Sequence, residues 1–302
     1  MAETKTVVDQ QSRIAVVTGG NGGIGFEICK QLAMEGLTVI LTSRDQQKGI
    51  EAVKNINKNN IRFYQLDVTD PHSIASLANY IKTQFGKLDI LVNNSGVLGA
   101  TIDTDLLERL GFKAGDASYE NAMLLLKSMK QTYDNAKVCV ETNYYGVKHV
   151  TKALIPLLRL SAKPTIVNVS SVTGKLENVT KERARAVLSE VDDLTEEKID
   201  EIVEEFLKDA EEDKIESKGW PNNLSAYTVS KAAQNGYARV LARDVPDLII
   251  NAVCPGYTQT GLNGHQGEHS AEIGAKGPVM LALNPPSGCS GFFFNQTQIS
   301  EF

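Results

Sequence analysis

A tyrosine and a lysine four residues apart are the side chains in this sequence best suited to proton transfer. Residues 225–231 read SAYTVSK, and on a helix Tyr227 and Lys231 lie on one face, one turn apart. A free phenol titrates near pH ~10, but an ammonium one turn away stabilises the phenolate. We therefore expect Lys231 to lower the pKa of Tyr227 toward the range that general acid–base chemistry uses. Most such pairs are a half-buried tyrosine beside a solvated lysine, so the elements around the pair must decide its role.

The N-terminal part of the chain predicts a nucleotide-binding turn. An apolar run at 13–18 precedes the glycine-rich segment 19–25, and an amphipathic helical pattern follows from Phe26. Strand, glycine turn and helix in this order cradle a pyrophosphate, because glycines let the backbone approach it and the helix N-terminus faces its charge. The spacing departs from the usual G-x-G-x-x-G, and an ordinary glycine turn is the alternative. The residues expected to contact the dinucleotide here are Gly19, Asn21, Gly23, Ile24 and Gly25.

The ends of the second and third expected strands bear on the choice of cofactor. A binder of the unphosphorylated dinucleotide carries an acidic residue at the end of the second strand, where it holds the ribose 2′-hydroxyl. The strand at 37–44 instead ends in Ser43 and Arg44, which suit a 2′-phosphate. Asp45 follows directly, and a surface arginine is the alternative interpretation. We expect NADPH rather than NADH. The residues expected beside the adenine end the third strand: Asp67 and Val68.

Apolar runs alternate with helical patterns along the rest of the chain, which predicts an α/β fold. Strands separated by helices of this length form a Rossmann-like, doubly wound parallel sheet of about seven strands flanked by helices. Two segments interrupt the rhythm, from 98 to about 136 and from about 175 to 223, and we expect helical insertions over the substrate site. The chain 1–302 is then a single domain. The other elements expected are strands at 62–68, 88–96, 165–171, 248–254 and 291–294, and helices at 71–85, 123–129, 271–283 and 136–160, the last kinked or ended by Pro156.

Composition and charge exclude several classes of protein. The chain has 302 residues, of which 42% are hydrophobic and 23% charged, as in ordinary soluble globular proteins. A net charge of −6 leaves no electrostatic footprint for a nucleic acid. No run approaches the ~20 apolar residues that span a membrane, and residues 1–12 show no signal peptide. The four cysteines lack metal or disulfide spacing, so we expect no metal site and a cytoplasmic location.

Six motifs follow one another along the chain: Thr18-Gly19-x-x-x-Gly23-Ile24-Gly25, Asn93-Asn94-x-Gly96, Asn143, Ser171, Tyr227-x-x-x-Lys231 and Pro255-Gly256. Taken in this order, they resemble the motifs of the short-chain dehydrogenase/reductase family over nearly the whole chain. The segments at 25–30, 41–44, 194–200 and 290–294 narrow the resemblance to plant carbonyl reductases of the salutaridine reductase and neomenthol dehydrogenase type. That branch is similar in carrying both insertions.

The resemblance implies a role for each motif. Tyr227 would protonate the nascent alkoxide, Lys231 would lower the tyrosine pKa and hold the cofactor ribose, and Ser171 would hydrogen-bond the substrate carbonyl. Asn143 would order a water that relays protons to Lys231. From the sequence pattern alone, Ser171 could also be a turn serine. The remaining cofactor contacts that the family implies are Asn94, Gly96, Pro255, Gly256, Thr258 and Thr260.

The activity implied is NADPH-dependent reduction of a ketone to a secondary alcohol, or the reverse. The substrate would be a hydrophobic, cyclic plant metabolite, either a monoterpenoid or an alkaloid, in an apolar pocket. Two alternatives stay open: a double-bond reductase acting on enones, and a dinucleotide-binding protein without turnover. In the double-bond reductase of this branch the tyrosine position is not a tyrosine, and a mere binder has no need of a complete proton relay. The residues expected around the substrate are Val97, Leu98, Val172 and Tyr257.

The resemblance also predicts the oligomeric state, and the chain departs from the family pattern at three places. An insertion at 98–136 would cover the helix through which simpler members associate, so we expect a monomer. The same segment would form a flap that excludes water from the reaction. The departures are Gly22 where NADPH users often carry lysine, Ser95 where alanine is usual, and Thr260-Gly261 in the substrate loop.

Overall fold

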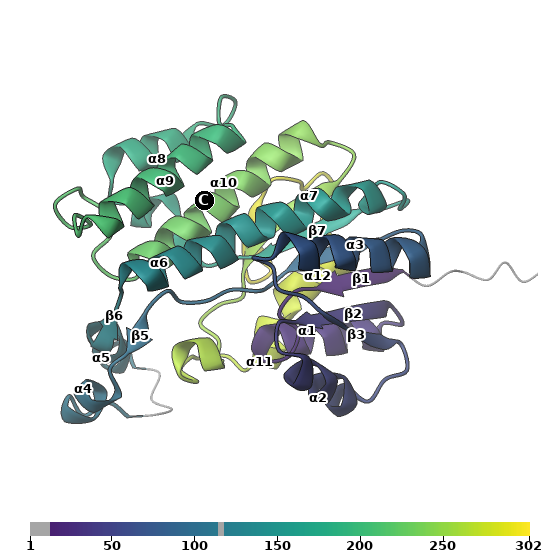
Figure 1. Cartoon of the computed structure of the whole chain (residues 1–302), viewed down its shortest axis with the longest axis horizontal. Helices are drawn as coiled ribbons and strands as arrows, with labels where there is room; N and C mark the ends of the chain where they lie inside the picture. The colour runs from purple at the N-terminus through teal and green to yellow at the C-terminus, as the bar shows by residue number, and fades with distance from the viewer. Residues whose placement is uncertain (1–12, 114–117) are drawn as a thin grey trace, which may run out of the picture.

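The computed structural model describes residues 13–113 and 118–302 as an eight-stranded sheet with helices on both faces (Figure 1). The strand order is β10-β9-β8-β7-β4-β1-β2-β3, and all neighbours are parallel except β9 and β10. The predicted doubly wound α/β sheet is confirmed. The strands are β1 Ile14–Val17, β2 Thr38–Ser43, β3 Ile61–Gln65, β4 Ile90–Asn93, β7 Thr165–Val169, β8 Ile249–Cys254, β9 Phe293–Asn295 and β10 Gln298–Ser300.

The sequence analysis missed the last strand, β10, which adds an edge to the predicted sheet. It pairs antiparallel with β9 after a tight turn in which Gln296 has a φ of 55°. Its side chains are mostly solvent-facing, and Ile299 is 55% exposed. An edge strand of this kind has no buried face, so it lacks the apolar alternation that identifies a strand in sequence.

Successive strand residues bury against two different helix layers, because side chains alternate between the faces of a sheet. In β1, Ala15 and Val17 belong to one apolar cluster, and Ile14 and Val16 belong to the other. The first layer contains α1 Gly23–Met34, α2 Gln46–Ile56, α11 Ala271–Gly274 and α12 Lys276–Leu283. The second contains α3 Pro71–Phe85, α6 Tyr133–Val140, α7 Gly146–Leu158 and α10 Ser225–Asp244.

The strand order reverses at β1, which lies between β2 and β4. In doubly wound sheets this reversal opens a crevice beyond the carboxyl ends of the strands, where ligands bind. Val17 is in register with Leu41 of β2 and with Val92 of β4. The segments that follow these three strands therefore emerge at one edge of the sheet, which brings the glycine turn, Arg44 and Asn94 together.

The two insertions lie at different places on the fold (Figure 1). The first forms a small two-stranded sheet with two short helices, and residues 114–117 of the predicted flap are outside the described residues. The second packs its longest helix, α9, against α6 and α10. We expected the first insertion to cover the helix that follows it, and that expectation is wrong, because α9 of the second insertion packs there. The elements are β5 Thr101–Ile102, α4 Thr104–Arg109, α5 Tyr119–Ser128 and β6 Met129–Lys130, then α8 Glu182–Ser189 and α9 Glu196–Glu211.

The long helix predicted before the fifth strand is interrupted in the structure. A π-helical turn, Glu141–Tyr145, separates α6 from α7. Such a turn carries one extra residue per hydrogen-bonded ring and is frequent at functional sites. Pro156 does not end the helix. It lies within the last turn of α7, which continues to Leu158.

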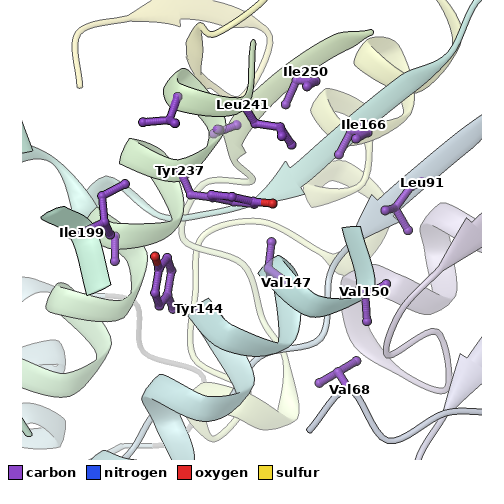
Figure 2. Close-up of a cluster of buried hydrophobic side chains, with 14 of the residues drawn as sticks. Val68, Leu91, Tyr144, Val147, Val150, Ile166, Ile199, Tyr237, Leu241 and Ile250 are labelled. Atoms are coloured by element: carbon purple, nitrogen blue, oxygen red, sulfur yellow. The ribbon is translucent and has the colours of Figure 1, made fainter. Parts of the chain in front are cut away.

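Two buried tyrosines sit between α7, α9 and α10 with very different hydrogen bonding. The hydroxyl of Tyr144 donates to Asp200 of α9 at 2.7 Å, whereas the buried hydroxyl of Tyr237 on α10 has no partner among the described residues. Their rings meet edge to face, with centroids 6.4 Å apart. Figure 2 shows the Tyr237 ring among apolar side chains that include Val147.

This contrast predicts opposite effects for the same substitution. Tyr144→Phe should lower the free energy of unfolding by about 1–3 kcal/mol, because it removes a hydrogen bond to a carboxylate. Tyr237→Phe should leave it unchanged or raise it, because the hydroxyl is desolvated without compensation. Urea denaturation of both variants measures the difference. A larger loss in Tyr237→Phe than in Tyr144→Phe would contradict the assignment.

Candidate active site

A cavity of about 760 Å³ lies at the carboxyl ends of the strands, beside the reversal at β1. It brings together most of the residues predicted from the sequence. Those that line it are Gly19, Asn21, Gly23, Ile24, Gly25, Ser43, Arg44, Asp67, Val68, Asn94, Gly96, Tyr227, Lys231, Pro255 and Thr260. Four predicted residues are not in its lining: Asn143, Ser171, Gly256 and Thr258.

The glycine turn is held open by the amide of Asn94. Its Nδ2 atom donates to the carbonyl oxygens of Thr18 at 2.9 Å and Gly19 at 3.1 Å. A Cβ atom on Gly25 would collide with this amide nitrogen and with the Gly19 carbonyl oxygen. Gly19 itself has a φ of +65°, in the left-handed region that favours glycine. The side chain of Asn94 therefore shapes the turn, and it fits there only because Gly25 carries no Cβ atom.

A basic corner of the cavity surrounds the end of β2. Arg44, just before the N-cap of α2, and Lys48, in the first turn of α2, both line the cavity and both are exposed. Asp45 also lines it, but its carboxylate caps α2 by accepting from the backbone N–H of Lys48 at 3.0 Å. The sequence analysis missed Lys48, although a second basic residue four positions after Arg44 was the available signal. A Cβ atom on Gly22 would meet nothing within 4 Å, so this departure leaves open space.

Tyr227 and Lys231 lie on the cavity wall as predicted, but the pKa prediction for the tyrosine is wrong. The ammonium of Lys231 lies 5.8 Å from the centroid of the Tyr227 ring. Loss of solvation raises the pKa of Tyr227 above its ordinary value, and a hydrogen bond with Ser171 acts in the opposite direction. Burial lowers the pKa of Lys231 to about 8. Loss of solvation, which the sequence does not reveal, therefore outweighs the attraction between Tyr227 and Lys231.

Ser171 stands beside the tyrosine, at the start of a tight turn. Its hydroxyl donates to the Thr173 hydroxyl and accepts from the Thr173 backbone N–H, both at 3.1 Å. The turn then packs on α10 through Gly174, where a Cβ atom would lie 2.6 Å from the carbonyl carbon of Lys231. Only a glycine lets the turn approach α10 this closely. Gly174 therefore sets the distance between Ser171 and α10, the catalytic helix that carries Tyr227 and Lys231.

Gly174→Ala tests this close contact. The added methyl group meets backbone, which cannot move aside, so Ser171 must shift away from Tyr227. We expect turnover to fall about 10- to 100-fold, because sub-ångström misplacement of reacting groups carries penalties of this size. The control is Gly236→Ala on α10, where a Cβ atom meets side chains no closer than 3.4 Å. Steady-state kinetics showing equal, small losses in both variants would contradict the role of Gly174.

Asn143 is fully buried behind the cavity, within the π-helical turn. Its Oδ1 atom accepts from the backbone N–H of Val97 at 2.8 Å, and its Nδ2 atom donates to the Val97 carbonyl at 2.9 Å and to the Ser230 hydroxyl at 3.1 Å. Ser230 in turn donates to the carbonyl oxygen of Tyr227 at 2.8 Å. The asparagine side chain therefore ties the segment after β4 to the catalytic helix.

The N-terminus of the catalytic helix is capped from outside. Leu224, which precedes it, has a φ of 50° and gives no side-chain cap. Gln131, at the end of the first insertion, accepts from the backbone N–H of Ala226 at 2.9 Å and donates to the Ser225 hydroxyl at 2.7 Å. The first insertion is thus attached to the helix two residues before Tyr227. Sequence reasoning missed Gln131 because its partners lie 94 and 95 residues away.

The loop after β8 closes the cavity opposite the glycine turn. Pro255 and Thr260 line the cavity, and a Cβ atom on Gly23 would lie 3.2 Å from the Thr260 methyl group. Thr258 is buried, and its hydroxyl donates to the carbonyl oxygen of Gly256 at 3.1 Å. Of the two predicted threonines, Thr260 is therefore the one in contact with the cavity.

The cavity at the strand reversal has Tyr227 and Lys231 in its lining and Ser171 beside the tyrosine, which is the arrangement of a nicotinamide-dependent oxidoreductase. The protein-family model described as short chain dehydrogenase matches residues 13–183. The chain belongs to the short-chain dehydrogenase/reductase family, whose members bind a nicotinamide dinucleotide.

Particular relatives narrow this further. Salutaridine reductase of Papaver somniferum is 50% identical over 311 residues, covering 100% of both chains. The solved structure of that reductase has a TM-score of 0.89 and covers 94% of this chain and 99% of its own. (+)-Neomenthol dehydrogenase of Arabidopsis thaliana is 48% identical, covering 98% of this chain and 100% of its own. (−)-Isopiperitenone reductase of Mentha piperita is 47% identical, covering 93% and 96%.

Proposed function

We propose that this protein reduces a ketone on a hydrophobic, cyclic plant metabolite to a secondary alcohol with NADPH, or catalyses the reverse oxidation. The observation that carries the proposal is that one cavity is lined both by Tyr227 and Lys231, with Ser171 bonded to the tyrosine, and by the glycine turn and Arg44. The names of the similar proteins, a reductase of salutaridine and a dehydrogenase of neomenthol, support the same chemistry.

The residues of the cavity fit a dinucleotide. The turn is so tight that a Cβ atom on Gly25 would collide with Asn94 and with the Gly19 carbonyl oxygen, and a close glycine turn before a helix is the arrangement that binds a pyrophosphate. The hydroxyl of Ser170 is buried, lines the cavity and has no hydrogen-bond partner among the described residues. Arg44 and Lys48 would hold a 2′-phosphate, which favours NADPH over NADH. Bound there, NADPH would supply the hydride for a carbonyl carbon.

The chain's own residues would bind and protonate the carbonyl oxygen of the substrate. The Tyr227 hydroxyl stays protonated at neutral pH, because its pKa is raised, and would donate its proton to the carbonyl oxygen. The Ser171 hydroxyl would exchange its bond to the Thr173 hydroxyl for a second hydrogen bond to the same oxygen. Lys231 would stabilise the phenolate that forms after the transfer. We keep the proposal that Asn143 orders a relay water, because it bonds to Ser230 beside the catalytic pair.

The pocket for the substrate is apolar. Val172, directly after Ser171, is 40% exposed, and Tyr257 and Leu262 in the loop after β8 are 37% and 39% exposed. Val97 lines the cavity on the other side. Apolar side chains left in solvent around a catalytic group favour a hydrophobic substrate. We propose that the first insertion is a flap over it, supported by the contact of Asn121 on α5 with Gln266 of this loop, 3.5 Å apart.

Assembly and location complete the proposal. We propose a monomer of 32.9 kDa, because α9 covers α6 and α10 with a buried apolar stripe that includes Ile199 and Phe206. Among residues 13–113 and 118–302, no helix is both long and apolar enough to cross a bilayer. All four cysteines are free thiols, which supports a reducing compartment, the cytoplasm. Light scattering on the purified protein should give the monomer mass, and a dimer mass would contradict this part.

The proposed activity is tested with purified protein, NADPH and a panel of monoterpenoid and alkaloid ketones. We expect NADPH oxidation with cyclic ketones, alcohol as the product, and slower turnover with NADH. Saturated ketones as products from enones would favour double-bond reduction. Tight NADPH binding without turnover of any ketone or enone would favour the non-catalytic alternative.

A further inference from the structure

A buried glutamine contacts the catalytic lysine and has no role in the chemistry described so far. Gln234 lies on α10, three residues after Lys231, and is 1% exposed. Its Oε1 atom accepts from the Lys231 ammonium at 3.0 Å, and the backbone carbonyl oxygen of Val169 accepts from the same ammonium at 2.8 Å. The lysine is therefore held between its own helix and the end of β7.

The orientation of the Gln234 amide is fixed by the lysine. An ammonium has three donors and no acceptor, so only the amide oxygen can face it. The Nε2 atom of Gln234 is consequently buried with no hydrogen-bond partner among the described residues. An unpaired buried N–H group is costly, and such a group in a folded protein calls for an explanation. The explanation is that the other end of the amide, Oε1, gives Lys231 a hydrogen-bond acceptor.

Two of the three donors of Lys231 are thus occupied by fixed acceptors, and the side chain still lines the cavity. We propose that Gln234 is a positioning residue for Lys231, which holds the ammonium protonated and leaves its third donor for the cavity. This inference rests on the proposed function only for its effect on turnover. The state of the lysine itself is a property of the folded chain.

Among residues 13–113 and 118–302, the acceptors bonded to the Lys231 ammonium are both neutral. The titratable groups that act on Lys231 are Cys139 of α6, Cys254 of β8 and Tyr227 of its own helix. Burial raises the pKa of each of the three, so all are neutral near pH 8. The positive charge on Lys231 therefore depends on neutral acceptors, of which Gln234 is the only side chain shown to bond to it within the described residues.

The direct test is the titration of Lys231 in protein labelled with [ε-¹³C]lysine, with its resonance assigned from its absence in Lys231→Met. The wild-type midpoint should lie near pH 8. Gln234→Met keeps the length of the side chain and removes the acceptor, so the midpoint should fall by about one pH unit. Gln234→Glu adds a negative charge, so the midpoint should rise. Tyr237→Phe, one turn further along the helix, should titrate as wild type does.

The same variants separate this inference from the proposed function. If the protein reduces ketones, the loss of activity at alkaline pH should move with the lysine, to lower pH in Gln234→Met and to higher pH in Gln234→Glu. A merely structural role would change thermal stability without moving these midpoints in opposite directions. Unshifted lysine midpoints in both folded variants would overturn the inference. Shifted midpoints without turnover in any variant would sustain it and reject the reductase instead.

Discussion

Tyr227→Phe should lose ketone reduction by about 10²- to 10⁴-fold, the usual contribution of a positioned acid–base group. The substitution removes one oxygen atom and keeps the ring. The phenol is the only proton donor of the cavity wall that is both adjacent to Ser171 and within one turn of Lys231 among the described residues. Without it the alkoxide loses its proton source and keeps only the hydrogen bond from Ser171, so kcat should fall while NADPH affinity stays close to that of the wild type.

The measurement pairs initial rates with a fluorescence titration of NADPH, so that chemistry and binding are read separately. Tyr80→Phe is the matched control, because Tyr80 lies on α3 and stacks on Tyr64 away from the cavity. Undiminished ketone turnover in Tyr227→Phe would remove the tyrosine from the mechanism. A parallel loss of NADPH binding and turnover would point to a structural defect rather than a lost acid.

Arg44→Glu should weaken NADPH binding by about 100-fold or more and leave NADH binding nearly unchanged. The guanidinium would pair with the 2′-phosphate, and a carboxylate in its place would add repulsion next to Asp45. Lys48 lines the same corner and would still attract the phosphate, so the loss should be incomplete. Binding should also become less dependent on salt, because one phosphate contact is gone.

Titration of both dinucleotides at two salt concentrations measures this effect. Arg185→Glu on α8 is the control, since it makes the same change of net charge on an exposed residue outside the cavity lining. Equal NADPH affinity in Arg44→Glu and Arg185→Glu would mean that the arginine at the end of β2 does not select the cofactor. In that case Lys48 would be the next residue to change.

Local patterns predicted the parallel sheet and the ends of its strands, because both depend on residues close together in sequence. Arg44 and Gly25 follow directly from strand, turn and helix signals of this kind. Gln131 and Gly174 were out of reach, since their roles come from partners on α10 that only the folded chain brings near. The location of α9 was out of reach for the same reason.

The pKa of Tyr227 shows a different limit. The spacing of Tyr227 and Lys231 predicts attraction between a phenolate and an ammonium, and the two side chains are indeed neighbours. Burial costs the charged form of both groups, however, and a sequence gives no measure of burial at a single atom. The prediction of one uninterrupted helix around Asn143 was partly wrong for a related reason. The π-helical turn found there accompanies side-chain hydrogen bonds from Asn143 to Val97, which is distant in sequence.

The central claim is that the wild-type protein reduces a carbonyl group by way of Tyr227, and a cyclic enone tests it most directly because it offers both a C=O and a C=C bond. The product formed with NADPH is identified by mass spectrometry and NMR. We predict the allylic alcohol, with the double bond retained, and its loss in Tyr227→Phe. A saturated ketone as the main product, formed equally by the wild type and by Tyr227→Phe, would contradict the account.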